Sequence, residues 1–66
     1  MIVVTAKLPN GNLVRQEYPD SMTEENALEL HMFEVGWNHI DLKVRDWYGY
    51  VTDPANYKVK RVDEGA

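Results

Sequence analysis

Apolar and polar residues alternate along the first part of the chain. Over residues 2–8 the even positions are all apolar, whereas the odd positions mix a valine with a threonine and a lysine. A period of two is typical of a strand with one buried face. The alternation stops at Pro-Asn-Gly over residues 9–11 and resumes over residues 13–18. We therefore predict a β-hairpin.

Two turns compete at the tip of this hairpin. A two-residue Asn-Gly turn would place Glu17 opposite Val4 and put a charge on the apolar face. A three-residue loop over residues 9–11, with its glycine in the left-handed conformation, instead places Tyr18 opposite Ile2. Because register follows the buried face, we predict the three-residue loop.

A helix is predicted over about residues 24–35. Its start can be read in two ways, since Ser21 and Glu24 fit a capping box, whereas Thr23 could cap the helix itself. Gly36 is a natural terminator in the left-handed conformation. At about 100° per residue, the helix has an apolar face that would pack on the sheet. That face contains Ala27, Leu28, His31 and Val35.

Alternation returns over residues 39–51 and predicts a third strand, with a bulge or bend at Gly49. A turn follows, and residues 57–60 predict a fourth, short strand. The resulting fold class is α+β, a two-layer ββαββ domain over residues 1–66 with a frayed tail at 63–66. A right-handed crossover gives one small antiparallel sheet with the strand order 2-1-3-4 and the helix packed on one face.

Length and composition limit the classes of protein that are plausible. The chain has 66 residues, of which 44% are hydrophobic and 27% charged, a globular rather than a disordered balance. It has no cysteine, which excludes disulfides and zinc–thiolate sites. It has neither the features of a signal peptide nor an apolar run near the ~20 residues that cross a bilayer. We expect a cytoplasmic protein without a membrane partner.

Charge is distributed unevenly around a net value of −4. Between positions 17 and 34 the chain carries six carboxylates and no Lys or Arg. Glu25 and Glu29 would lie on the outer face of the helix, where they could dock on a basic partner. The plainer interpretation is a solvated helix surface with acidic residues near its N-terminus.

Cationic side chains are predicted to gather on the sheet face that points away from the helix. Trp47 would join them if the third strand stays regular. An open basic sheet with an aromatic residue is one way to bind single-stranded nucleic acid, although long cationic side chains are also ordinary on a solvated sheet. The predicted basic residues are Lys7, Arg15, Lys43, Arg45, Lys58 and Lys60.

Aromatic residues cluster near the end of the predicted third strand, where Tyr57 would face Trp47, Tyr48 and Tyr50 across a turn. Trp and Tyr are enriched at the energetic centres of protein interfaces, but a small domain also needs aromatics in its own core. Trp47 and Tyr50 are therefore candidate partner contacts, together with the two glutamates of the helix.

Catalytic and metal-binding signals are missing from the sequence. His31 and His39 are eight positions apart with no third ligand nearby, Ser21 is the sole serine, and the four glycines are isolated. We therefore predict no enzyme activity, no metal and no cofactor.

The expected function is a non-catalytic protein-binding module, an inhibitor or adaptor that docks through its acidic helix or a sheet edge. Its plan resembles compact bacterial or bacteriophage accessory proteins, without a family motif, so a larger partner of that kind is expected. Pairing with itself to form a homodimer through a sheet edge is a further option. The alternative is a single-stranded nucleic-acid-binding module that uses the basic face with Trp47.

Overall fold

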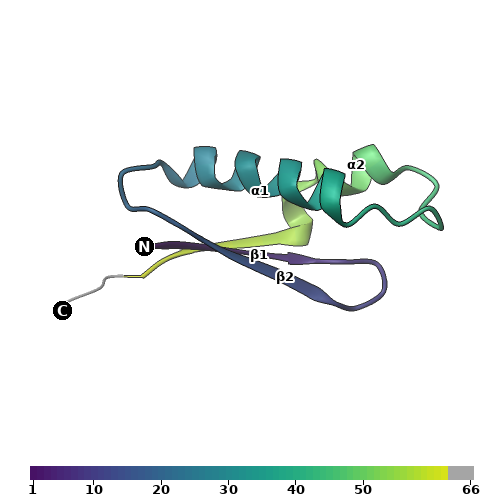
Figure 1. Cartoon of the computed structure of the whole chain (residues 1–66), viewed down its shortest axis with the longest axis horizontal. Coiled ribbons are helices and arrows are strands. Elements are labelled where there is room, and N and C mark those ends of the chain that lie inside the picture. Colours follow the sequence, from purple (N-terminus) through teal and green to yellow (C-terminus); the bar gives the residue numbers. More distant parts are fainter. Residues whose placement is uncertain (63–66) are drawn as a thin grey trace.

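An N-terminal hairpin and a C-terminal strand form one antiparallel sheet, and a long helix covers one face of it (Figure 1). The computed structural model describes residues 1–62. The α+β class is confirmed, with one main helix and three strands. The elements are β1 (Ile2–Lys7), β2 (Leu13–Tyr18), α1 (Glu24–Asn38), α2 (Trp47–Val51), the 3-10 helix η1 (Pro54–Asn56) and β3 (Tyr57–Arg61).

The hairpin has the predicted register. Ile2 lies opposite Tyr18, and Ala6 lies opposite Val14. The loop closes with a hydrogen bond of 2.8 Å from the main-chain nitrogen of Leu8 to the oxygen of Asn12. Gly11 takes a φ of 90°, the left-handed conformation that the three-residue loop requires. The buried face therefore determined the turn, as expected.

The sheet order is β2-β1-β3, so the predicted order 2-1-3-4 with a fourth strand is wrong. The stretch 39–51 contains no strand; it forms a loop and then the short helix α2. In the loop, the carboxylate of Asp41 accepts from the nitrogen of Lys43 at 3.0 Å, and its carbonyl accepts from Val44 at 3.1 Å. This Asp-initiated turn competes with the extended backbone that the apolar alternation predicted, and Leu42 is left 94% exposed.

Of the two predicted starts of helix α1, the cap at Thr23 is the one observed, and the helix ends later than expected. Thr23 is its N-cap, and the Thr23 hydroxyl accepts from the nitrogen of Asn26 at 3.0 Å. The predicted end at Gly36 is wrong, because the helix continues to Asn38 and His39 caps it. Gly36 therefore has helical neighbours on both sides and does not terminate α1.

The core lies between α1 and the helix-facing side of the sheet. Alternate residues of β1 point into it, while Ala27, His31 and Val35 of α1 are buried against them and Leu28 is half-buried. Residues of α2 and β3 complete it with Val51 and Tyr57. The central position of β1 between two partners makes it the most buried strand.

The frayed tail expected at residues 63–66 lies outside the described residues. Within residues 1–62, none of the helices combines the length and the apolar character that a membrane span would need.

Candidate functional site

Large apolar side chains are exposed on one surface of the molecule, around the C-terminal half of α1 and the short helix α2. Phe33 is 65% exposed, Trp37 75% and Tyr48 79%, and Leu30 and Ile40 are about half exposed. Single exposed apolar residues are ordinary on protein surfaces, but a group of them marks a binding surface or an aggregation hazard.

All of these side chains except that of Leu30 border a groove of about 450 Å³ between α1 and α2. Glu29 is the one charged residue of its lining. A concave, mainly apolar surface of this size suits an apolar side chain or a row of them from another molecule. The principal apolar residues of the groove are Phe33, Trp37, Ile40, Trp47, Tyr48 and Val51.

Trp47 forms part of the groove and also holds α2 against α1. Its indole nitrogen donates a hydrogen bond of 3.0 Å to the carbonyl oxygen of Gly36. The Trp47 ring stacks on Tyr50, with ring centroids 6.0 Å apart and an interplanar angle of 10°. Gly36 lies at the same helix–helix contact, where a Cβ would be at an ordinary van der Waals distance of 3.5 Å from Val51. The groove is therefore built on a close helix–helix contact.

Further polar contacts fix α2 at its remaining sides. The Asp46 carboxylate caps the helix by accepting from the nitrogen of Gly49 at 3.0 Å. The Tyr50 hydroxyl donates to the carbonyl oxygen of Lys7 at the end of β1, and the Tyr57 hydroxyl donates to that of Val51. Burial raises the pKa of Tyr57 to about 12, so this hydroxyl stays a donor even at alkaline pH, where an exposed tyrosine would ionise.

The two candidate glutamates of α1 lie beside the groove. Glu29 lines it, and Glu25 precedes Glu29 by one helical turn on the same side. No ion pair among residues 1–62 involves either of them, whereas Glu24 pairs with Arg61 at 3.7 Å. Of the predicted partner contacts, Glu29 and Trp47 therefore line the groove. Glu25 lies one helical turn before Glu29 on the same side of α1, and Tyr50 stacks on the Trp47 ring without lining the groove itself.

The predicted basic face is present only in part. The register places Lys7, Arg15, Lys58 and Lys60 on the sheet face away from α1. Lys43 and Arg45 are instead in the loop before α2, and the prediction that they share the sheet is wrong. Trp47 belongs to α2 and contributes to the groove, so its predicted place on the basic face is also wrong.

His31 is fully buried in the middle of α1, with both ring nitrogens hydrogen-bonded. Nε2 donates to the carbonyl oxygen of Val14 at 2.9 Å, and Nδ1 accepts from the Tyr18 hydroxyl at 3.2 Å. Tyr18 and Tyr57 meet the ring edge-on. Burial lowers the pKa of His31 below its usual 6.5, since a charged ring would lose its hydration there. His31 therefore acts as a neutral core residue.

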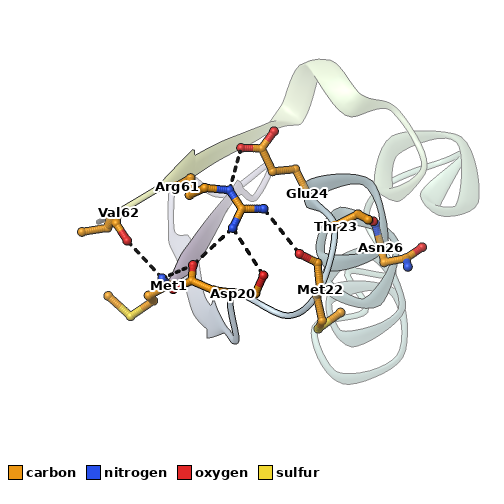
Figure 2. A network of polar contacts seen from close by, with 8 residues as sticks. All are labelled: Met1, Asp20, Met22, Thr23, Glu24, Asn26, Arg61 and Val62. Carbon is orange, nitrogen blue, oxygen red and sulfur yellow. Dashed lines mark hydrogen bonds and ion pairs between the residues drawn. The ribbon is translucent and has the colours of Figure 1, made fainter. Parts of the chain in front are cut away.

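A polar network ties the end of β3 to the segment before α1 (Figure 2). Arg61 contacts the Asp20 carboxylate at 3.2 Å and Glu24 at 3.7 Å. The Met1 ammonium group donates to Asp20 and to the carbonyl oxygen of Val62. The hydrogen bond from Met1 is the main reason that the pKa of Asp20 lies below its usual 3.8. Most of these contacts are exposed, and they hold the sheet end in place beside a shallow hollow that Met1 and Asp20 help to line.

Phe33, Trp37 and Ile40 were missed as functional candidates by the sequence interpretation. A signal was available, because Leu30, Phe33 and Trp37 form a second apolar row on α1, away from the buried face of Ala27 and Val35. Because α1 packs on the sheet with one face only, a second apolar row on another face has no packing partner on the sheet.

Within the described residues, His, Asp and Glu side chains nowhere gather in a group of three that could hold a metal ion. Comparison with known proteins gives no relative for this chain, since no family model, curated protein or solved structure matches it.

Proposed function

We propose that this chain is a non-catalytic protein-binding module whose groove between α1 and α2 takes an apolar segment of a larger partner. The observation that supports this most directly is the exposure of Phe33, Trp37 and Tyr48 around one concave surface. Covering these rings with a partner would remove a large apolar area from water, at about 25 cal/mol per Å². Trp and Tyr are also the residue types that most often dominate binding energy.

The groove offers recognition without reaction chemistry. Its one charged residue, Glu29, is exposed, and His31 is enclosed in the core with both nitrogens bonded. A module of this kind would act as an inhibitor or adaptor by occupying a surface of its partner. Because α2 is anchored to α1 and to the sheet, the groove is formed before the partner arrives, which lowers the entropic cost of binding.

Site-specific photo-crosslinking tests this proposal in cells that make the protein. Phe33 is replaced by the photo-crosslinking residue p-benzoylphenylalanine, and the chain is irradiated and recovered. We expect one predominant adduct with a larger protein. A second exchange, Trp37→Ser, should abolish that adduct because it removes the neighbouring apolar contact.

The matched control carries the same photo-crosslinking residue at Leu13, which is 66% exposed on the other side of the sheet. It should give none of the adduct obtained at Phe33. If both positions give the same adducts, or if Trp37→Ser has no effect, the groove is not the binding surface.

A second candidate function is binding of single-stranded nucleic acid on the open sheet face. Its support is that Lys7, Arg15, Lys58 and Lys60 share this face, where Thr5 lies directly opposite both Arg15 and Lys58. Four cations on one face could follow a phosphate backbone. With Trp47 elsewhere, this candidate depends on charge alone.

Fluorescence anisotropy of a labelled oligonucleotide tests the second candidate. Binding at low salt that weakens in Lys58→Gln/Lys60→Gln, but not in the loop variant Lys43→Gln, would favour it. Absence of binding at low salt would remove it.

A further inference from the structure

We infer that the groove between α1 and α2 receives an amphipathic helix that carries Lys or Arg at the end lying over Glu25 and Glu29. This inference rests on the proposed function, and it adds the partner's secondary structure, its charge and the position of its basic end. It is carried by the combination of an apolar groove, a ridge of side chains at helical spacing and two carboxylates without an ion-pair partner among residues 1–62.

The shape of the surface favours a helical occupant. Glu29, Phe33 and Trp37 follow one another at intervals of four residues along α1 and form a ridge beside the groove. Helices pack by setting such ridges into the grooves of a neighbour. Eight residues of helix rise about 12 Å, which is room for roughly three anchors spaced one turn apart on the partner.

The charge of the surface favours a basic occupant. Helix α1 contains four glutamates and no Lys or Arg. Glu24 is engaged by Arg61, and Glu34 lies toward Tyr18 and His31 on the other flank of the helix. Glu25 and Glu29 are thus the two carboxylates on the groove side, and within residues 1–62 neither has an ion-pair partner. A partner with cations there would complement them.

The charges also determine where the basic end of the bound helix lies. Beyond the C-terminal end of α1, the loop carries Lys43 and Arg45 together with Asp41 and Asp46, so positive and negative residues balance there. The uncompensated negative charge is at the opposite end, near Glu25 and Glu29. The basic end of the partner helix should therefore lie toward the N-terminus of α1.

A second copy of the chain fits this surface less well. It would bring another α1 with the same glutamates and no Lys or Arg of its own, in a protein whose net charge is already −4. Like charges at close range oppose association.

A patterned peptide library tests the inference on the full-length protein. Displayed peptides of about 16 residues have Leu at the i, i+3, i+4 and i+7 positions of one helical face and Lys or Glu in equal proportion elsewhere. We expect peptides selected by the protein to be enriched in Lys, mainly toward one end. Selection by the variant Glu25→Gln/Glu29→Gln should lose that enrichment, whereas the matched control Glu34→Gln should retain it.

Titration with one selected peptide then measures the effect, with Trp37 and Trp47 as reporters because both line the groove. Loss of the two carboxylates should weaken binding about tenfold at low salt, since each exposed pair contributes modestly. Salt of about 0.5 M should remove most of the difference. The photo-crosslinking experiment above reports on the groove independently of charge.

Three outcomes would overturn the inference. If binding of the selected peptides requires Trp37 but the peptides show no preference for Lys, the groove binds helices, and only the predicted positive charge of the partner is wrong. If no selected peptide depends on Trp37, the helix-binding groove fails, while photo-crosslinking still decides the proposed function. If light scattering shows a dimer that Trp37→Ser dissociates, the occupant is a second copy.

Discussion

The indole nitrogen of Trp47 lies 3.0 Å from the carbonyl oxygen of Gly36 and donates a hydrogen bond to it. This contact joins the short helix α2 to the C-terminal turns of α1. The sequence analysis predicted Trp47 as a partner contact. In the structure its ring has two roles, since it lines the groove and also stacks on Tyr50. The two tryptophans of the chain therefore differ, since Trp37 is the more exposed one.

Trp47→Phe should lower the free energy of unfolding by about 1–2 kcal/mol, because it removes the indole donor and part of the packed ring. Chemical denaturation followed by circular dichroism measures this change. Trp37→Phe is the matched control and should change stability by less than about 0.5 kcal/mol. Equal effects at the two positions would contradict the assigned roles.

Gly36→Ala should stabilise the protein by about 0.5–1 kcal/mol, because alanine favours the helical conformation more than glycine does. The added methyl group would meet Val51 at 3.5 Å, which is an ordinary van der Waals distance. Gly36 is not among the residues with positive φ, so alanine fits without strain. Thermal unfolding is the measurement, and a clear loss of stability would mean that the contact between α1 and α2 is tighter than described.

Gly49 and Asp46 should show coupled effects. A Cβ at Gly49 would collide with the Asp46 carboxylate that caps α2. In the wild-type background, Gly49→Ala should therefore lower the free energy of unfolding because it displaces the capping carboxylate. In the background of Asp46→Ala, where that cap is already absent, the effect of Gly49→Ala on the free energy of unfolding should be more favourable by about 1 kcal/mol. A double-mutant cycle measures this term, and additive effects would show that the cap does not restrict position 49.

His31 should make stability depend on pH. Since its folded-state pKa is lowered from 6.5, the unfolded chain binds the proton more readily. The contribution of neutral His31 is complete above about pH 6.5 and is lost as the pH falls below that value, with a slope of at most about 1.4 kcal/mol per pH unit. Urea denaturation between pH 7.5 and about 5 should show this decline.

His31→Gln should flatten the dependence in that window, whereas His39→Gln should preserve it. Asp20 cannot produce the same signal, because its lowered pKa makes its contribution disappear only below its unperturbed value of 3.8. A wild-type stability that stays constant down to pH 5 would contradict the burial of a neutral ring at position 31.

Local signals predicted the hairpin and the start of α1 because those signals agree with the packing. The three-residue loop, the apolar even positions of β1 and the Thr23 cap each point to the same arrangement. Gly36 misled the interpretation because a glycine can end a helix but need not do so. At Gly36 the backbone stays helical, and its carbonyl oxygen accepts the hydrogen bond from Trp47 of α2.

Residues 39–51 could not be assigned correctly from alternation alone. Ile40, Leu42 and Val44 have the period of a strand, but β1 already has β2 and β3 on its two sides, so a further strand could pair only at the outside of the sheet. The turn at Asp41 and the cap at Asp46 favour other structures. The groove depends on the helical conformation of α2, which lines one side of it, so a strand prediction for these residues could not reveal the groove.

The central strand β1 pairs on one side with its neighbour in the chain and on the other with residues from the far end, so that Ile2 lies opposite both Tyr18 and Arg61. During synthesis on the ribosome the hairpin can form early, while the other side of β1 stays unpaired until Tyr57–Arg61 have emerged. Pairing between such distant segments slows folding, and an unpaired apolar strand edge invites association with other chains. Until β3 pairs with it, β1 therefore keeps one edge open to association with other chains.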